Sequence, residues 1–338
     1  MPSLELAPCP VCGANDHVLV ADADDIRREV ELLWEFHRPR LRPGAPPARL
    51  ADRVAFSQHP PLQLVRCSRC DLIYRNPRER SSELRATYEH DSPDRAVLES
   101  LFHNQRRTFH TQARRLTRVL GRTGSGIELG SYVGAFLDAA RAEGWHFRGL
   151  DINECVVSFA REHALDATLG DIDSLDSSQR YDAVAIWNTF EQLPEPSEVV
   201  RRAHTVLRDG GVLAIRVPNG DFYAALRPYL SGPAASVARA LLAQNNLLTF
   251  PYRHGFTPRS LRTLLEQCGF TIVRTLGDTL VPTSDEWTRP WAVVEERVVK
   301  SLLRPLGRLG VRPWLEVYGE RKQTADSSQL PGFRRQGG

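Results

Sequence analysis

Strand-like and helix-like segments alternate between residues 125 and 218. Short apolar, β-branched segments such as GIELG, YDAVAIWN and GVLAIRVPN are separated by segments with helical periodicity at 135–143, 154–163 and 196–207. This alternation predicts a mainly parallel sheet with helices on both faces. Ligands of such sheets bind at the carboxyl ends of the strands.

Further elements flank the predicted α/β sheet. Hydrophobic periodicity predicts helices at 24–37, 96–120, 258–268 and 291–309, and apolar segments predict strands at 270–276 and 314–318. We expect the last of these helices to pack on its own domain, although its amphipathic pattern also fits a lid, a dimer surface or a helix on a membrane surface.

The same patterns divide the chain into parts. We expect a small module at 1–80, a linker at 81–97, an α/β domain at 98–322 with insertions at 220–256 and 285–309, and a polar, disordered tail at 323–338.

Composition limits the classes of protein to consider. Hydrophobic residues make up 41% and charged residues 25% of the 338 residues, as in ordinary globular proteins. No apolar run approaches the roughly 20 residues that cross a bilayer, so we expect no membrane span. The net charge of only +3 does not favour a dedicated nucleic-acid binder but leaves one open. The N-terminus lacks a secretory signal pattern, which predicts a cytoplasmic protein with reduced cysteines.

Two C-x-x-C motifs lie in the first 80 residues, Cys9-Pro-Val-Cys12 and Cys67-Ser-Arg-Cys70. Each motif can present two thiolates to one metal ion, so together they predict a tetrahedral Cys₄ zinc site. Because all four coordination positions would be filled by protein, the zinc would be structural. A redox dithiol is the less favoured alternative, since it needs only one pair.

The first strand of the predicted sheet ends in the turn Glu128-x-Gly130-x-x-x-Gly134. Glycines in a strand-to-helix turn let the backbone approach a ligand, and the following helix offers unpaired N–H groups. A dinucleotide-binding turn reads G-x-G-x-x-G, and an acidic residue beside its pyrophosphate would be repelled. Glu128 therefore favours a cationic ligand.

The next three predicted strands also end in residues that suit a ligand. Asp151 follows the second strand, where an acidic residue can accept hydrogen bonds from ribose hydroxyls. Asp171 and Ile172 follow the third strand and could contact an adenine, and Trp187 and Asn188 end the fourth. Each residue taken singly also fits a structural role, since aspartate often caps a helix.

The order and spacing of these motifs resemble the small-molecule branch of the class I S-adenosylmethionine (SAM)-dependent methyltransferases, over roughly residues 98–322. The matching segments are IELGSYVGAFL, GLDI, GDI, YDAVAIWNTFEQLPEP, LRDGGVLAIRVPN and HGFTPRSLRTLLEQCGF. The resemblance implies a Rossmann-like, seven-stranded, mostly parallel sheet with helices on both faces, and SAM as the cofactor. Relatives with a cysteine knuckle followed by a segment like IYRNPR carry an N-terminal zinc ribbon, which implies a small Cys₄ ribbon here.

The resemblance also implies which residues bind the donor. The first strand end would surround the methionine part of SAM, the second would bind the ribose and the third would flank the adenine. The residues carried over to these positions are Glu128, Gly130, Tyr132, Gly134, Asp151, Ile152, Asp171, Ile172, Trp187 and Asn188. Tyr132 replaces a glycine that is common in the family, so the turn must accommodate a side chain.

Two residues are candidates for a catalytic base. His254 lies in a loop that the resemblance places over the acceptor pocket, and Glu191 precedes Gln192, where many relatives have histidine. Tyr223 and Tyr252 are candidates for lining the same pocket. A base is optional, because the methyl group of SAM is already activated and the enzyme mainly orients the acceptor and excludes water. A structural loop histidine fits His254 equally well.

Three functions fit the sequence. We expect methylation of an O, C or N atom of a small-molecule acceptor, in secondary or sugar metabolism, since the segment WNTF at 187–190 lacks the Asn/Asp-Pro-Pro-aromatic run of base amino-methylating enzymes. The alternatives are an RNA or protein methyltransferase that grips its substrate with the ribbon, and a non-catalytic SAM-fold interaction protein. The arginines of the helix at 96–120 could follow phosphates, although a solvated face is the simpler interpretation. A homodimer is compatible with each function.

Overall fold

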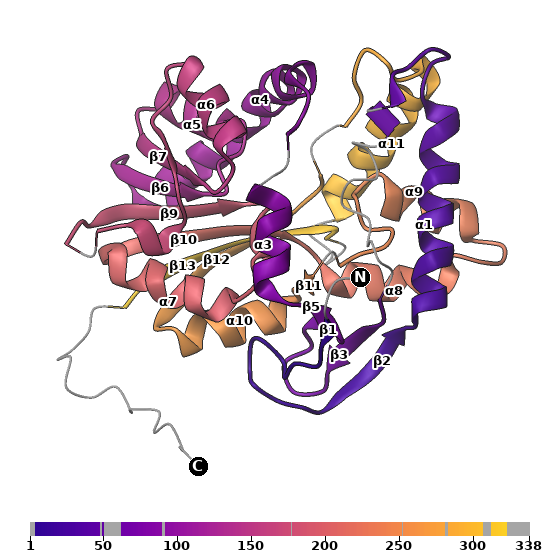
Figure 1. The fold of residues 1–338 in the computed structure, drawn as a ribbon, viewed down its shortest axis with the longest axis horizontal. Helices are drawn as coiled ribbons and strands as arrows, with labels where there is room; N and C mark the ends of the chain where they lie inside the picture. Colours follow the sequence, from indigo (N-terminus) through magenta and orange to yellow (C-terminus); the bar gives the residue numbers. More distant parts are fainter. Residues whose placement is uncertain are drawn as a thin grey trace.

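The computed structural model describes residues 4–47, 49–50, 62–89, 92–176, 178–251, 253–280, 283–306 and 312–322. Its largest sheet has seven strands in the order β12-β13-β10-β9-β6-β7-β8 (Figure 1). Strands β6 to β10 run parallel, and β13 is antiparallel to both of its neighbours. The strands are β6 (Ser125–Leu129), β7 (His146–Asp151), β8 (Ala167–Leu169), β9 (Tyr181–Trp187), β10 (Leu207–Pro218), β12 (Phe270–Asp278) and β13 (Trp314–Arg321). The predicted seven-stranded, mostly parallel sheet is confirmed.

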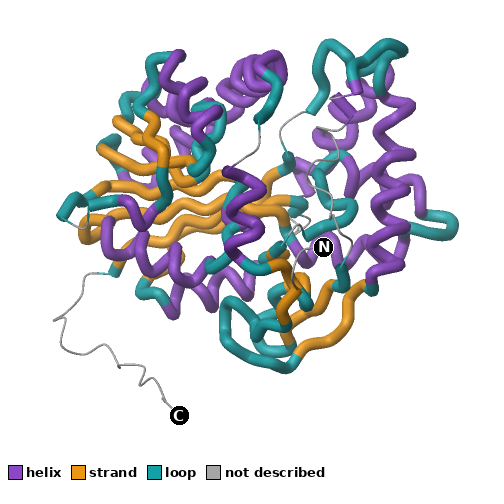
Figure 2. Tube along the Cα trace, viewed as in Figure 1, coloured by secondary structure: helices purple, strands orange, loops and turns teal. Residues whose placement is uncertain are grey.

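Helices cover both faces of this sheet (Figure 2). Side chains of β9 alternate between two buried cores: Ala183 and Ala185 face one helical layer, and Val184 and Ile186 face the other. The alternation follows from the period of two in a strand. One layer contains α4 (Arg95–Leu120), α5 (Ala135–Ala142) and α6 (Glu154–Glu162), and the other contains α7 (Pro196–Val206) and α10 (Pro258–Gln267). Each helix begins and ends within one residue of its predicted position.

A second sheet has four strands in the order β11-β4-β3-β2. The strands are β2 (His17–Ala21), β3 (Leu64–Cys67), β4 (Ile73–Arg75) and β11 (His254–Gly255), and a separate pair joins β1 (Leu4–Glu5) to β5 (Arg78–Glu79). β11 pairs with β4 through His254 and Tyr74, although it belongs to the expected insertion at 220–256. The N-terminal module at 1–80 therefore does not complete its sheet alone.

Four helices from distant parts of the chain form a cluster that we call the helical lobe. They are α1 (Ala23–His37), α8 (Gly220–Leu226), α9 (Ala235–Ala243) and α11 (Pro290–Leu306), and Figure 1 shows them together at one end of the molecule. Ile26 of α1 shares a buried core with Phe222 of α8, Leu242 of α9 and Leu303 of α11. Because α8 begins two residues after β10 ends, the lobe lies beyond the carboxyl end of that strand.

A buried carboxylate fastens α1 to the rest of the helical lobe. The side chain of Glu29 is 3% exposed and accepts hydrogen bonds from the Tyr223 hydroxyl at 3.1 Å, Arg227 Nε at 2.9 Å and the Thr249 backbone N–H at 3.1 Å. All three donors lie about two hundred residues further along the chain. The network satisfies the buried oxygens and joins the N-terminal helix to the expected insertion at 220–256.

Residues 81–97 differ from the expected linker. They contain helix α3 (Ser81–Glu89) and the first residues of α4. The expected tail at 323–338 and the end of the expected helix at 307–309 lie outside the described residues. Within the described ranges, no helix has both the length and the hydropathy needed to span a membrane.

The Glu29 network gives a first prediction. Glu29→Ala should lower the free energy of unfolding by about 2 kcal/mol, because buried donors from Tyr223 and Thr249 would lose their acceptor. Urea unfolding followed by tryptophan fluorescence measures the loss. The exposed Glu31→Ala on the same helix should change stability by less than about 0.5 kcal/mol. Equal effects of the two substitutions would contradict the interpretation.

Candidate functional site

The turn after β6 brings backbone and acidic side chains together at the carboxyl edge of the sheet. Gly130 and Gly134 have φ values of 66° and 72°, in the left-handed region that glycine tolerates. A Cβ atom at Gly130 would lie 2.5 Å from Thr189 Cγ2, so no larger residue fits there. Tyr132 also has a positive φ of 45°, and its backbone N–H donates to Asp151 Oδ2 at 2.9 Å. This bond holds the turn after β6 against the end of β7.

Asp151 ends β7 beside that turn. Its other oxygen, Oδ1, accepts from the backbone N–H of Asn153, two residues further along, at 3.0 Å. Ile152, between these two residues, is half-buried. The carboxylate therefore fixes the ends of β6 and β7 relative to each other. Asn153 in turn caps α6, accepting from the backbone N–H of Cys155 at 2.9 Å.

Glu128 is buried, and the negative charge of the half-buried Asp151 acts on it. Glu128 is 3% exposed, and its Oε2 atom has no hydrogen-bond partner among the described residues. Burial raises the pKa of Glu128 well above its ordinary value, and the negative charge of Asp151 raises it further. Burial also raises the pKa of Asp151. Two acids held in this way are stabilised by a positive charge, so the site fits a cationic ligand such as the ammonium group of SAM.

Helix α3 reaches the ends of β7 and β8. Arg85 Nη1 donates to Asp171 Oδ2 at 2.5 Å, and Asn153 Nδ2 donates to the backbone oxygen of Tyr88 at 2.8 Å. Asp171 also caps the short helix η2 (Ile172–Ser174), accepting from the backbone N–H of Asp173 at 3.1 Å. Figure 1 shows α3 in front of the sheet. The sequence analysis did not predict a role for Arg85, because its segment was expected to be a linker.

The end of β9 carries two of the predicted donor residues. The ring of Trp187 packs edge-on against Phe136 of α5, with 5.3 Å between centroids, and its Nε1 has no partner within the described ranges. Asn188 has a φ of 58°, and its side-chain oxygen accepts from the buried Arg216 of β10. Arg216 also donates to the backbone oxygen of Thr279 at 2.8 Å, so it links Asn188 to the segment that follows β12. No sequence motif singled out Arg216.

Glu191 lies directly after this strand end. It belongs to the short helix η3 (Phe190–Gln192), and its Oε2 atom is buried without a hydrogen-bond partner among the described residues. Burial raises the pKa of Glu191 to about 7. A carboxylate with such a pKa can hold or release a proton near neutral pH.

His254 belongs to β11 of the four-stranded sheet, which contacts the short helix η3 that contains Glu191. In β11 it faces Phe256, with 6.0 Å between ring centroids, and Phe256 stacks on Phe190 at 4.9 Å. Burial and the positive charges of Arg253 and Arg78 lower the pKa of His254 well below its ordinary value, so the ring is neutral at pH 7. The structure thus brings β11 and η3 into contact.

The structure does not place either of the two tyrosines that were expected to line the acceptor pocket at the strand ends. Tyr223 is fully buried and gives its hydroxyl to Glu29 in the helical lobe, so it does not present that group to the strand ends. The expectation that Tyr223 lines the acceptor pocket is not supported. Tyr252 lies outside the described residues.

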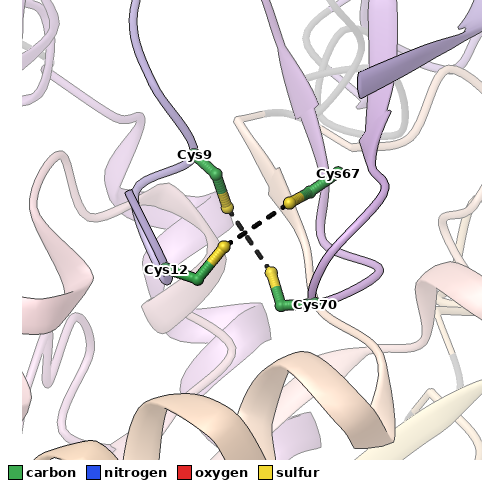
Figure 3. A group of neighbouring side chains, drawn as sticks. All are labelled: Cys9, Cys12, Cys67 and Cys70. Carbon is green, nitrogen blue, oxygen red and sulfur yellow. Dashed lines mark hydrogen bonds between the residues drawn. The ribbon is translucent and has the colours of Figure 1, made fainter. Parts of the chain in front are cut away.

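The four motif cysteines converge on one point (Figure 3). Cys9 Sγ lies 3.5 Å from Cys70 Sγ, Cys12 Sγ lies 3.5 Å from Cys67 Sγ, and all four sulfurs lie within 4.8 Å of one another. Zinc–sulfur bonds of about 2.3 Å in a tetrahedron would separate the sulfurs by about 3.8 Å. The arrangement therefore fits a zinc ion with four thiolate ligands.

The cysteine knuckles pack on the methyltransferase-like part of the chain. Ser197 of α7 donates through its hydroxyl to the backbone oxygen of Pro10 at 2.8 Å, between the first two cysteines. Val11 shares a buried core with Leu264 and Leu265 of α10. A metal at the knuckles would hold this contact in place.

Comparisons with known proteins agree with the geometry. A family model described as a methyltransferase domain matches residues 102–275, just over half of the chain. A ubiquinone biosynthesis O-methyltransferase of Stutzerimonas stutzeri (strain A1501) is 28% identical over 94 residues, which cover 25% of this chain and 40% of that protein. The chain thus matches less than half the length of this curated relative.

Two solved structures have similar folds. A SAM-dependent methyltransferase from Archaeoglobus fulgidus is 20% identical with a TM-score of 0.44, covering 68% of this chain and 100% of its own. The plantazolicin methyltransferase BpumL in complex with SAH is 14% identical with a TM-score of 0.45, covering 71% and 94%. On the family match, which covers more than half of the chain, the chain belongs to the family of proteins with this methyltransferase domain.

Proposed function

We propose that this methyltransferase transfers the methyl group of SAM to an O, C or N atom of a small-molecule acceptor, in secondary or sugar metabolism. The observation that carries the donor side is the buried Glu128, with the half-buried Asp151 beside it at the carboxyl edge of the sheet. The named activity of the curated relative, an O-methyltransferase of ubiquinone biosynthesis, supports a small-molecule acceptor.

The residues proposed for the donor site follow the strand ends. Glu128, with the turn that contains Gly130, Tyr132 and Gly134, would hold the methionine part of SAM. The second and third strand ends would bind the ribose and the adenine, and the fourth would lie beside the methyl group. The residues of those three ends are Asp151, Ile152, Asp171, Ile172, Trp187 and Asn188. Arg85 would stay near the adenine side through its ion pair with Asp171.

The catalytic task of the chain is mainly positioning. SAM supplies an activated methyl group, which moves to the acceptor by in-line displacement. Glu191 is the proposed base, because its unpartnered oxygen and pKa of about 7 suit a proton acceptor that starts ionised in part at neutral pH. His254 is neutral and is the second candidate, as a base or a positioning residue.

The alternative of an RNA substrate receives little support from α4. Arg106 bonds Asp138 at 3.2 Å, and Arg114 bonds Glu143 at 2.9 Å. Arg115 reaches the buried Glu316 at 2.7 Å. These arginines are neutralised by carboxylates of their own domain, so they do not form a free phosphate-binding face.

We also propose that residues 1–80 form a module held together by a structural zinc ion bound to Cys9, Cys12, Cys67 and Cys70. The Cys9–Cys70 and Cys12–Cys67 contacts support this assignment, because they link the two knuckles crosswise. The module and the α/β domain at 98–322 would act as one unit, since β11 joins them.

The acceptor class can be tested with methyl-labelled SAM and a cell extract separated by size. The wild-type protein should label molecules of the small fraction. Glu128→Gln should weaken SAM binding, measured by calorimetry, at least tenfold and abolish labelling, because an amide does not pair with the ammonium group. The exposed Glu198→Gln on α7 should change neither. Label confined to RNA or protein would contradict the small-molecule proposal, and folded protein that binds no SAM would contradict the donor site.

The raised pKa of Glu191 predicts a pH-dependent stability. Folded protein keeps this proton up to pH 7, whereas unfolded protein releases it near the ordinary pKa of 4.5. Wild-type stability therefore falls as the pH rises from 4.5 to 7, and Glu191→Gln removes this loss. The variant should gain up to about 3 kcal/mol relative to wild type between pH 5 and pH 8, measured by urea unfolding. A difference that does not change with pH would overturn the assignment.

The zinc proposal predicts the metal content. Protein purified without oxygen should carry one zinc ion per chain, and Cys67→Ser should lose most of it and melt at a lower temperature. The exposed Cys155→Ser is the matched control and should keep the metal. Elemental analysis and thermal unfolding measure both effects, and a zinc-free wild-type protein would rule the site out.

A further inference from the structure

Three arginines are buried together where the N-terminal module meets the α/β domain. Arg75, Arg78 and Arg253 are 2%, 9% and 2% exposed. The backbone N–H of Arg75 donates to the backbone oxygen of Arg253 at 3.3 Å, so Arg253, the residue before β11, lies opposite Arg75 at the end of β4. Burying a guanidinium group is costly unless anions and hydrogen-bond acceptors surround it.

Two of the three arginines have carboxylate partners. Arg75 bonds Glu79 at 2.9 Å, and Arg78 bonds Glu5 at 3.0 Å and Glu195 at 3.1 Å. Of these carboxylates only Glu79 is buried with the cluster, whereas the side chains of Glu5 and Glu195 are 38% and 51% exposed. The buried part of the cluster therefore holds more positive than negative charge.

Arg253 has one complete edge without a partner. Its Nη1 donates to the backbone oxygen of Glu79 at 3.3 Å, while Nε and Nη2 are buried and have no partner among the described residues. The N–H bonds of Nε and Nη2 lie parallel on one edge of the guanidinium plane and match the two oxygens of a carboxylate or phosphate. Burial and the charges of Arg78 and Arg75 lower the pKa of Arg253 to about 10, which still leaves it charged at neutral pH.

Arg253 directly precedes β11, the strand that contacts the short helix η3 of Glu191. Since Arg253 lies opposite Arg75, it is on the face of the sheet away from Tyr74 and His254. On the neighbouring β4 that face carries Ile73, which packs into the core of the helical lobe. The partner of Arg78, Glu195, lies four residues after Glu191, a separation of at most roughly 14 Å. The proposed base and the arginine cluster are therefore close enough to be spanned by one extended acceptor.

We propose that Arg253, supported by the charge of Arg78, binds an anionic group of the methyl acceptor through two parallel hydrogen bonds. The acceptor would thus be an acid, carrying a carboxylate or a phosphate several bonds away from the atom that is methylated. This inference rests on the proposed transfer to a small molecule, but anion binding can be measured without any methyl transfer.

Benzoate and inorganic phosphate are suitable probes, titrated separately at constant ionic strength into the full-length, zinc-loaded, SAM-bound protein and followed by heteronuclear NMR. We expect saturable binding of one probe, which tells a carboxylate acceptor from a phosphate. Arg253→Lys keeps the charge but lacks the two-pronged edge, and should weaken that binding at least tenfold. Arg253→Gln should weaken it further, and the exposed Arg262→Gln on α10 should leave it unchanged.

If Arg253→Gln no longer binds SAM and so has not folded, Arg253→Lys gives the result. Saturable binding of neither probe by a wild-type protein that binds SAM would overturn the proposal, as would equal affinities of wild type and Arg253→Lys. In the extract experiment, the labelled small molecule should be retained on an anion exchanger at pH 8. A labelled neutral molecule would contradict this inference alone, whereas no labelled small molecule would contradict the proposed function.

Discussion

The parallel run of β6, β7, β8 and β9 is the constraint on which the other parts of the structure depend. Parallel strands place all their carboxyl ends at one edge, so residues separated by tens of positions become neighbours. The hydrogen bond from the Tyr132 backbone N–H to Asp151 is an example, because it joins the turn after β6 to the end of β7. Gly130 is required for the same reason, since Thr189 from the fourth strand end fills the space a side chain would need.

The buried Glu128 and the half-buried Asp151 concentrate negative charge at this edge. Among the described residues, Glu128 Oε2 has no hydrogen-bond partner, and Asp151 accepts from the backbone N–H groups of Tyr132 and Asn153. Such a pair is unfavourable in the interior unless protons or a positive ligand neutralise it. The stability of two extensive apolar cores, one on each face of the sheet, sustains this local cost.

Around this edge the chain assembles its remaining parts from distant segments. The helical lobe combines α1 with helices that follow β10 and β12, and the Glu29 network locks them together. The Cys67–Cys70 knuckle forms the turn between β3 and β4, the Cys9–Cys12 knuckle precedes β2, and β4 pairs with β11. A zinc ion bound by the four cysteines would therefore influence, through β4, where His254 and Arg253 lie. A structural metal can in this way affect the acceptor side without touching it.

The sequence by itself determined the elements and the ends of the central strands. Periodicity located six helices to within one residue, and the motif spacing identified the turn at Glu128 and the four cysteines, because these signals are local. Only the tertiary structure decided that β11 completes the N-terminal sheet, that Arg85 of α3 meets Asp171, and that Tyr223 serves Glu29. A strand of two residues has no detectable period, and an ion pair or buried hydrogen bond between segments some 80 to 200 residues apart leaves no local trace. These contacts arise from packing, so they became visible only once the chain was folded.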